Sequence, residues 1–170
     1  MKQLIQTFIS LLAFTSLGTF AAENAVGEGA AAGGSFDTIE PTWVTHVAAG
    51  SNHTVLLDQD GRVFTFGYGS LGQLGHGDEE NKLVPTMIEP LEGTNIVQVA
   101  AGDYHTVLLG GDGRVYTFGS GEKGKLGHGD EENKLVPTMV ESLKDTNIVQ
   151  VAAGGIHTVL LDKNGRVFTF

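Results

Sequence analysis

The chain has no cysteine, and this absence removes two ways of bracing or tethering a protein. No disulfide framework can hold the fold together, and no lipid can be attached to a cysteine near the N-terminus. The stability of the fold must therefore come from the packing of its side chains. Helical periodicity is also missing beyond residue 22, so we expect no helix there.

Basic residues are scarce as well, with 10 lysines and arginines against 20 aspartates and glutamates in 170 residues. Neutralisation of backbone phosphates by lysine and arginine dominates the affinity of proteins for nucleic acids. An acidic chain with no basic stripe in its sequence is therefore not expected to bind DNA or RNA directly.

The first 22 residues have the layout of a secretory signal peptide. Lys2 precedes a mostly apolar run over 4–20, and Ala21 and Ala22 close it. We therefore expect export to the periplasm, the cell surface or the extracellular space, with cleavage after one of these alanines. An uncleaved membrane anchor is the alternative, but the run is barely long enough to span a bilayer. After cleavage no stable membrane insertion is expected, and 9 basic against 20 acidic residues give a net charge of −11.

Residues 23–42 differ in composition from both neighbouring segments. They are rich in glycine and alanine, carry scattered acids and show no period. A segment with so little to bury is predicted to be a flexible linker. The ordered domain is therefore expected to comprise residues 43–170.

The main feature of this domain is a phrase that occurs three times, Val-Ala-Ala-Gly-x-x-His-Thr-Val-Leu-Leu. It begins at Val47, Val99 and Val151, so the period is 52 residues. Residues 47–98 and 99–150 align without a gap and differ at 13 of 52 positions, and a partial third copy covers 151–170. A fixed period of this size is typical of propellers and solenoids.

Each repeat divides into four short strands separated by glycine, aspartate and asparagine. In the second copy the expected strands are Ile96–Ala100, His105–Leu109, Arg114–Phe118 and Leu135–Val140, all rich in β-branched and aromatic residues. The second and third strands of the copies are joined at Asp60-Gly61, Asp112-Gly113 and Asn164-Gly165. These pairs predict hairpins with type I′ turns, in which both central residues need positive φ.

The strands are apolar on both faces. Val63 and Thr65 point to one side of their strand, while Phe64 and Phe66 point to the other. A sheet with one solvated face would alternate apolar with polar residues. The small sheets must therefore be covered on both sides, which favours an all-β fold, a partial β-propeller of four-stranded antiparallel blades.

A third phrase carries a resemblance to a known family. Residues 67–78 and 119–130 both fit Gly-x-Gly-x-x-Gly-x-Leu-Gly-His-Gly-Asp. Together with Val-Ala-Ala-Gly-x-x-His-Thr-Val-Leu-Leu and with Asp-Gly-Arg-Val-x-Thr-Phe-Gly at 60–67 and 112–119, this pattern resembles the repeat of the regulator of chromosome condensation family, over roughly residues 43–170. The resemblance implies a seven-bladed β-propeller whose loops face protein partners. The founding member of that family is a nucleotide exchange factor for a small GTPase and sits on chromatin.

The length of the repeat region departs from the family pattern. Residues 47–170 supply about 2.4 periods, whereas propellers have roughly four to eight blades. We therefore expect a fragment of a longer propeller. The alternative is that several copies associate through their open blade edges and complete a ring between chains.

Several motifs resemble binding sites, but structural roles explain them better. The Gly-x-Gly-x-x-Gly spacing at 67–72 and 119–124 needs a following helix to bind a dinucleotide, and glycines at 75 and 77 prevent one. No cofactor is therefore expected. The repeated histidines His53, His105, His157, His76 and His128 are spread one per blade at each position rather than converging, so we expect no metal site. We expect them to bond to backbone carbonyls.

Acidic residues also recur, at 78–80 and 130–132. We expect these corners to be solvated loops, with weak calcium binding as the alternative. The segment Asp58-x-Asp60-Gly61 begins like a calcium loop but lacks the glutamate that would bind bidentately. The sequence contains no catalytic arrangement of serine, histidine and aspartate and no isolated carboxylate pair, so an enzyme is not expected.

Differences between the copies indicate where a binding surface could lie. Six of the 13 differences fall in the loops after the first and third strands, which emerge on the same face of a meander. Tyrosines there are typical anchors of protein interfaces. The candidate protein-binding residues are Ser51, Asn52, Tyr68, Ser70, Leu71, Asp103, Tyr104, Glu122 and Lys123. Neutral drift in exposed loops is the alternative.

The sequence therefore favours an exported protein-interaction scaffold with an unidentified protein partner. Three alternatives are open at this point. The family resemblance implies nucleotide exchange on a small GTPase, although export, acidity and length argue against it. A secreted bacterial relative of the fold that inhibits β-lactamases suggests an inhibitor of an extracellular enzyme. A structural repeat of an envelope or surface layer is the third.

Overall fold

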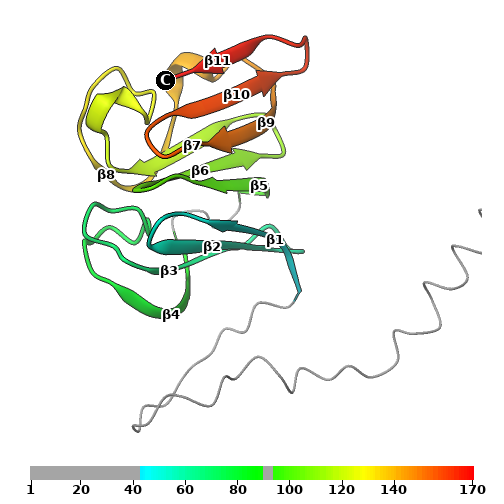
Figure 1. Cartoon of the computed structure of the whole chain (residues 1–170). Coiled ribbons are helices and arrows are strands. Elements are labelled where there is room, and N and C mark those ends of the chain that lie inside the picture. Colours follow the sequence, from blue (N-terminus) through cyan, green and yellow to red (C-terminus); the bar gives the residue numbers. More distant parts are fainter. Residues whose placement is uncertain (1–42, 90–93) are drawn as a thin grey trace, which may run out of the picture. The chain divides into compact units, whose positions relative to one another are not determined.

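The computed structural model of the chain describes residues 43–89 and 94–170. The predicted signal peptide, residues 1–22, and the predicted linker, residues 23–42, lie outside this part and stay predictions. The described residues form three antiparallel sheets that follow one another in chain order (Figure 1).

Each sheet is one blade. The first blade contains β1 (Val44–Ala49), β2 (His53–Asp58), β3 (Val63–Gly67) and β4 (Lys82–Met87). The second blade contains β5 (Ile96–Ala101), β6 (His105–Gly110), β7 (Val115–Gly119) and β8 (Lys134–Met139). The third blade contains β9 (Ile148–Ala153), β10 (Thr158–Asp162) and β11 (Val167–Thr169). Within each blade every strand pairs with its neighbour along the chain, and the four strands expected in the second copy are confirmed to within one residue at each end.

The hairpins between the second and third strands of the blades are confirmed, but the predicted turn type is wrong. Only the glycines Gly61, Gly113 and Gly165 have positive φ there, at 76°, 84° and 83°. In the first blade the Gly61 N–H donates to the Asp58 carbonyl at 3.2 Å, which closes a turn with a single left-handed residue. This is the turn of a type I hairpin with a glycine bulge, in which only the last loop residue needs positive φ.

A buried aspartate braces this turn in two of the three blades. The Asp58 carboxylate accepts hydrogen bonds from the Asp60 and Arg62 amides, both at 2.9 Å, and from the Arg62 side chain at 2.7 Å. Asp162 does the same for Asn164 and Arg166 in the third blade. The segment that begins like a calcium loop is therefore a capped turn.

Helical structure is limited to single turns. The described residues contain no α-helix, as expected, but one-turn 3₁₀ helices occur at η2 (Glu122–Gly124) and η3 (Glu141–Leu143). The sequence did not predict these turns because a three-residue helix is too short to show a periodic pattern.

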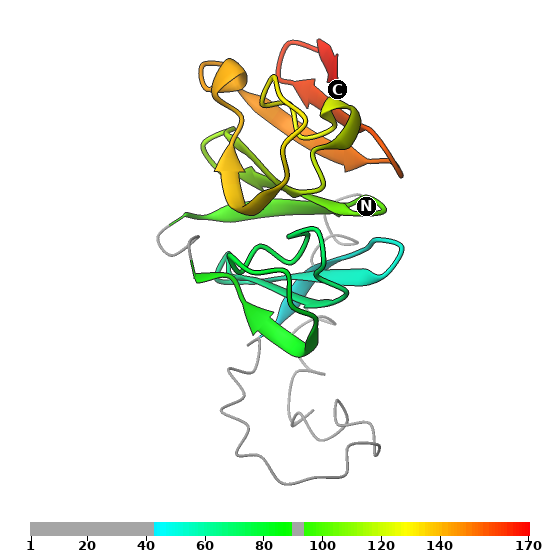
Figure 2. The ribbon, with the colours of Figure 1, turned by 90° about the vertical axis from the view of Figure 1, so that its left-hand side faces the viewer.

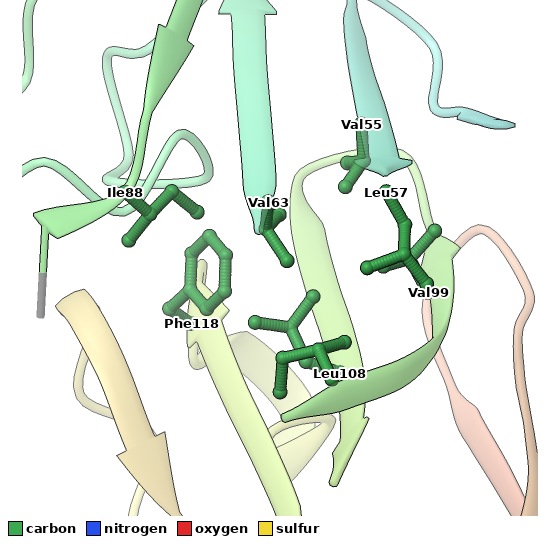
Figure 3. Close-up of a cluster of buried hydrophobic side chains, with 8 residues drawn as sticks. Val55, Leu57, Val63, Ile88, Val99, Leu108 and Phe118 are labelled. Atoms are coloured by element: carbon green, nitrogen blue, oxygen red, sulfur yellow. The ribbon is translucent and has the colours of Figure 1, made fainter. Parts of the chain in front are cut away.

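The core consists of two apolar junctions between blades. At the first junction, Val55, Leu57 and Val63 point from the first blade towards Val99 and Phe118 of the second (Figure 3). Full burial of each such side chain stabilises the fold by about 1.5–3 kcal/mol. The second junction contains Val107, Leu109, Val115, Val140, Leu143, Ile148, Val151 and Leu160. Seen at a right angle to the first view, the blades again stack face to face (Figure 2), as the apolar strand faces predicted.

Candidate protein-binding site on the loop face

Three loops meet at one end of the first junction and form a surface pocket of about 670 Å³. Asn52 comes from the loop after β1, Tyr104 from the equivalent loop after β5, and the rest from the loop after β3. The pocket, called here the Tyr68–Tyr104 pocket, is lined by Asn52, Tyr68, Ser70, Leu71 and Tyr104. Five of the nine residues predicted from the sequence therefore line one pocket.

Glycine at the end of β3 positions the first tyrosine. Gly67 has a φ of 110°, and a Cβ atom there would lie 2.5 Å from the Asn52 carbonyl oxygen. Only glycine lets the two loops approach so closely. The Tyr68 N–H then donates to that carbonyl at 2.8 Å, which places Tyr68 beside Asn52.

Buried polar contacts shape the rest of this loop. The Gln73 side-chain oxygen accepts a hydrogen bond from the Leu71 N–H at 2.9 Å, and the Asn81 side chain accepts one from Gly69 at 2.9 Å. Gln73 itself is fully buried, and its side-chain nitrogen has no hydrogen-bond partner among the described residues. The backbone of the pocket is thus held by side chains beneath it, while the pocket side chains stay accessible.

The lining is aromatic and polar but carries no charge. Tyr68 and Tyr104 are both more than a third exposed, and Ser70 and Leu71 are half-buried. Tyrosine offers a large rigid surface with only two rotatable side-chain bonds, so little conformational entropy is lost when a partner binds. Asn52 and Ser70 add an amide and a hydroxyl that can hydrogen-bond to a peptide backbone.

The other four predicted residues do not line this pocket. Ser51 and Asp103 lie in the loops after β1 and β5, where the Ser51 hydroxyl donates to the Asp103 carboxylate at 2.6 Å across the first junction. Glu122 and Lys123 lie in η2 of the second blade, where both are exposed and Lys123 has a φ of 63°. Ser51 and Asp103 therefore connect blades, and Glu122 and Lys123 belong to the loop of the next junction.

Lys125 is not among the nine predicted residues. It is only 2% exposed and occupies the position equivalent to Gln73. Burial lowers the pKa of its ammonium group, although the carboxylate of Glu122 acts in the opposite direction. The lysine carbonyl oxygen accepts a hydrogen bond from Thr158 at 2.8 Å, so the residue helps join the second and third blades. The only sequence signal was the difference from glutamine in the first repeat.

The repeated histidines have structural roles, but their partners differ from the prediction. His53 Nε2 lies 3.0 Å from the Thr106 hydroxyl, and His105 Nε2 lies 3.1 Å from the Thr158 hydroxyl. Each hydroxyl donates its own proton to a backbone carbonyl, Thr106 to that of Gln73. The histidine Nε2–H must therefore be the donor, and the bonds join side chains of adjacent blades rather than reaching backbone carbonyls.

The second set of histidines also bonds to threonine hydroxyls, but within a single blade. His76 Nε2 lies 2.9 Å from the Thr65 hydroxyl, and His128 Nε2 lies 2.9 Å from that of Thr117. Burial lowers the pKa of both histidines. Within residues 43–89 and 94–170, no three histidine, aspartate or glutamate side chains are grouped as ligands for a metal.

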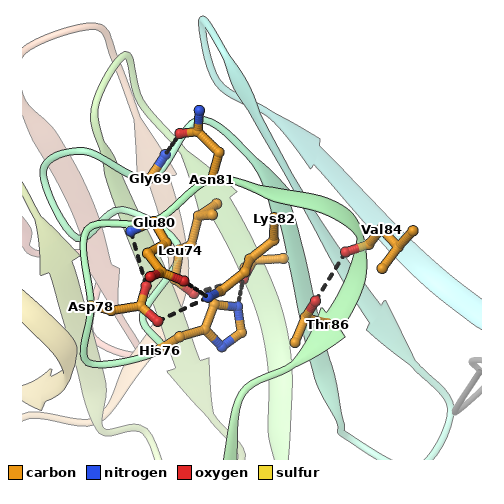
Figure 4. Close-up of polar contacts among 10 residues, drawn as sticks. Gly69, Leu74, His76, Asp78, Glu80, Asn81, Lys82, Val84 and Thr86 are labelled. Carbon is orange, nitrogen blue, oxygen red and sulfur yellow. Dashed lines mark hydrogen bonds and ion pairs between the residues drawn. The ribbon is translucent and has the colours of Figure 1, made fainter. Parts of the chain in front are cut away.

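The acidic corners contain a lysine. Lys82 Nζ lies 2.8 Å from an oxygen of Asp78 and 3.4 Å from one of Glu80 (Figure 4). The hydrogen bond from Lys82 lowers the pKa of Asp78, and the same bond raises the pKa of Lys82. Lys134 makes the equivalent contacts in the second blade. A lysine ammonium group thus pairs with the carboxylates that were considered as weak calcium ligands.

Comparison with known proteins identifies the repeat. Residues 60–109 and 112–161 match the family model described as the regulator of chromosome condensation (RCC1) repeat. A second model with the same description matches residues 44–73 and 96–125. No helix in the described part of the chain is long and apolar enough to cross a membrane.

Similar proteins are much longer than this chain. The human E3 ubiquitin-protein ligase HERC2 is 33% identical over 75% of this chain, which spans 3% of HERC2. The ultraviolet-B receptor UVR8 of Arabidopsis thaliana is 38% identical over 72% of this chain, which spans 28% of the receptor. Among solved structures, Prp20p of Saccharomyces cerevisiae, with described binding to Gsp1p and histones, is 26% identical with a TM-score of 0.67. That match covers 75% of this chain and 33% of Prp20p.

Proposed function

Because the chain belongs to the family of regulator of chromosome condensation repeats, we propose that it is a non-catalytic scaffold that binds a protein partner in the Tyr68–Tyr104 pocket. The observation that carries this proposal is the convergence of three loops on one uncharged pocket with two accessible tyrosines. Interface hot spots are enriched in tyrosine and cluster where a side chain of the partner can be enclosed.

The chemistry of the pocket indicates what part of a partner it accepts. Its volume of about 670 Å³ is within the usual range for sites that enclose small ligands. A short peptide segment fits the lining best, since the tyrosine rings can pack against an apolar or aromatic side chain. The amide of Asn52 and the hydroxyl of Ser70 can then pair with the peptide backbone.

A selection with random peptides displayed on phage would test this function directly on the full chain. Peptides that are enriched should lose at least about tenfold in affinity for a Tyr68→Ser, Tyr104→Ile double variant, because loss of one tyrosine anchor costs about 2 kcal/mol. These substitutions install the residues found at the equivalent positions Ser120 and Ile156, so the fold should tolerate them.

Ile156→Ala is the matched control for this selection. Ile156 is exposed and occupies the same loop position as Tyr104, but in the third blade. Its removal should leave peptide affinity unchanged. Peptides that bind the double variant as tightly as the unaltered chain would contradict the proposal.

We further propose that the mature protein is exported. The proposal is supported by the charged, apolar and small-residue sections of residues 1–22. Intact-mass measurement of the chain recovered outside the cytoplasm should give an N-terminus at residue 22 or 23. Recovery in the cytoplasm with residue 1 still present would contradict export.

Nucleotide exchange is a second candidate function, supported by the similarity to Prp20p, for which binding to Gsp1p has been described. The measurement that separates it from plain scaffolding is the release of a fluorescent guanine nucleotide from a small GTPase. We expect no acceleration by this chain, because its match covers only 33% of Prp20p. A concentration-dependent acceleration would favour exchange instead.

A further inference from the structure

The hairpin between β10 and β11 contains the one Asn-Gly pair of the sequence, Asn164-Gly165 (Figure 1). The other six asparagines are followed by alanine, histidine, lysine or isoleucine. The equivalent pairs of the first two blades are Asp60-Gly61 and Asp112-Gly113. The third hairpin therefore carries an amide where the other two carry a carboxylate.

An asparagine before glycine is prone to a reaction with its own backbone. The nitrogen of the following residue can reach the side-chain carbonyl carbon, Cγ, and close a five-membered ring. Glycine has no Cβ atom that would crowd this nitrogen or restrict the backbone angles that the ring needs. Asparagine is accordingly among the thermolabile residues that are scarce in hyperthermophilic proteins.

The turn holds the reacting groups only weakly. The Gly165 N–H donates to the Asp162 carbonyl oxygen at 3.1 Å, which is close to the longest usual distance for such a bond. The Asn164 side-chain nitrogen lies 3.5 Å from an oxygen of the Asp162 carboxylate, beyond the usual range. Neither contact therefore fixes the amide or the attacking nitrogen firmly.

The exposure of this position is a property of the turn itself. Asn164 is exposed. The first and second blades each have a further blade packed on them, and there the equivalent side chains of Asp60 and Asp112 are still 56% and 51% exposed. Water and hydroxide therefore reach this position whether or not another blade follows.

Other asparagines of the described chain are better protected. The side-chain oxygens of Asn81 and Asn133 accept hydrogen bonds from glycine amides at 2.9 and 3.1 Å. Asn95 and Asn147 precede isoleucine, whose branched Cβ atom crowds the backbone nitrogen. Asn95 and Asn147 can therefore serve as internal references for the reactivity of Asn164.

We propose that Asn164 is a site of spontaneous modification, at which it is converted into aspartate or isoaspartate. Hydroxide takes the proton of the Gly165 N–H, and this nitrogen forms a bond to Cγ of Asn164. The bond from Cγ to the side-chain nitrogen breaks, and that nitrogen takes a proton from water and leaves as ammonia. Water then adds to either carbonyl carbon of the ring and opens it. In sum, one water is consumed, one ammonia is released, and nothing is oxidised or reduced.

The first blade shows the aspartate product already in place. Its turn has the sequence Asp-Gln-Asp-Gly-Arg, against Asp-Lys-Asn-Gly-Arg in the third blade. The Asp60 amide donates to the Asp58 carboxylate at 2.9 Å, and the Asp60 carboxylate lies 3.4 Å from the Arg62 side chain. An aspartate in place of Asn164 should keep the turn in the same way, with Arg166 as its partner.

The isoaspartate product should disrupt the turn. Its backbone runs through the side-chain carbons and is longer by one atom. The Gly165 and Arg166 amides, which bond to Asp162 at 3.1 and 2.8 Å, would then be displaced from their acceptors. The modification would thus divide an ageing population into chains with an intact third turn and chains without one.

Incubation of the folded, full chain at pH 8 and 37 °C in water enriched in oxygen-18 tests the proposal. The chain is then digested in ordinary water, so that only changes made during the incubation carry the label. Mass spectrometry should show that the peptide with Asn164 exchanges its amide for one labelled oxygen and separates into two products, with isoaspartate in excess. The peptides with Asn95 and Asn147 should stay unchanged. At pH 6 the reaction should be slower, because it begins with removal of the Gly165 amide proton.

Asn164→Gln is the matched control, because it keeps the amide but would have to close a larger ring. This variant should retain its amide throughout the incubation. Asn164→Asp supplies the reference for the aspartate product, and its midpoint of urea unfolding should equal that of the unaltered chain. The isoaspartate form, separated by chromatography, should unfold at a lower urea concentration.

Two results would overturn the proposal. One is an Asn164 amide that lasts, in the folded chain, as long as the amides of Asn95 and Asn147. The other is conversion to aspartate with no isoaspartate, since direct attack of water on the side chain forms no ring. Neither result bears on the Tyr68–Tyr104 pocket, whose residues belong to other loops.

Discussion

Acidification should weaken the blade junctions through the two buried histidines that join them. Burial lowers the pKa of His53 and of His105 from 6.5 to about 4. For His105 the nearby Lys125 ammonium acts in the same direction, while Asp103 opposes it. Both rings are neutral in the folded protein at pH 7, and protonation would place a charge in an apolar junction.

The direction of the effect follows from proton binding. Between pH 6.5 and about 4 the unfolded chain binds protons at these histidines that the folded chain excludes, so stability falls as the pH falls through this window. Each pKa unit corresponds to about 1.4 kcal/mol, so each histidine accounts for roughly 3 kcal/mol of stability lost by pH 4. His76 and His128 act in the same direction.

Urea unfolding at a series of pH values between 7 and 4 measures this loss. A His53→Gln, His105→Gln variant keeps a side-chain N–H near each threonine but cannot be protonated, so its stability should decline much less across the window. His46→Gln, which changes an exposed histidine in β1, is the control and should keep the full decline. An equal decline in the double variant and the unaltered chain would refute the role given to the junction histidines.

Four further predictions concern stability, each measured by urea unfolding at pH 7. Phe118→Ala removes a fully buried ring from the first junction and should cost about 3–5 kcal/mol. Gly102→Ala places a Cβ atom on the ring of the junction histidine and should cost about 1–3 kcal/mol by overpacking. Gly124→Ala, with a φ of 71° but open space around it, should cost only about 1–2 kcal/mol of backbone strain. Asp58→Gly installs the residue of the second repeat and should lower the free energy of unfolding by about 1–3 kcal/mol, because the Asp60 and Arg62 amides lose their acceptor. An unchanged free energy of unfolding would show that the turn does not need this carboxylate.

The fold was predictable because the repeat carries the same information twice. Two 52-residue segments that differ at only 13 positions are expected to fold and pack in the same way. Their strands carry apolar residues on both faces, so each sheet must be buried on both sides. Strands such as Ile96–Ala101 were therefore found to within one residue. The position of Asn52, Tyr68 and Tyr104 at one end followed from the alternating direction of meander strands.

The details that failed depend on contacts outside the local sequence. Asp-Gly fits a type I′ turn and a bulged type I turn alike, and only the register of the flanking strands selects the second. The partner of His53 is Thr106, 53 residues away in the next blade, so no single repeat reveals it. The hydrogen bond between Ser51 and Asp103 was not predicted either, because equivalent positions of adjacent blades lie side by side only in the folded chain.

Near-identity of the repeats locates any specific function of this chain in the few positions that differ. The first junction presents Asn52, Tyr68, Ser70, Leu71 and Tyr104. The same positions one repeat later are Tyr104, Ser120, Glu122, Lys123 and Ile156. One backbone frame thus supports an uncharged site with two tyrosines at one junction and a charged loop with a single tyrosine at the next. A partner that discriminates between the junctions must contact these side chains, because the strands beneath them are almost the same.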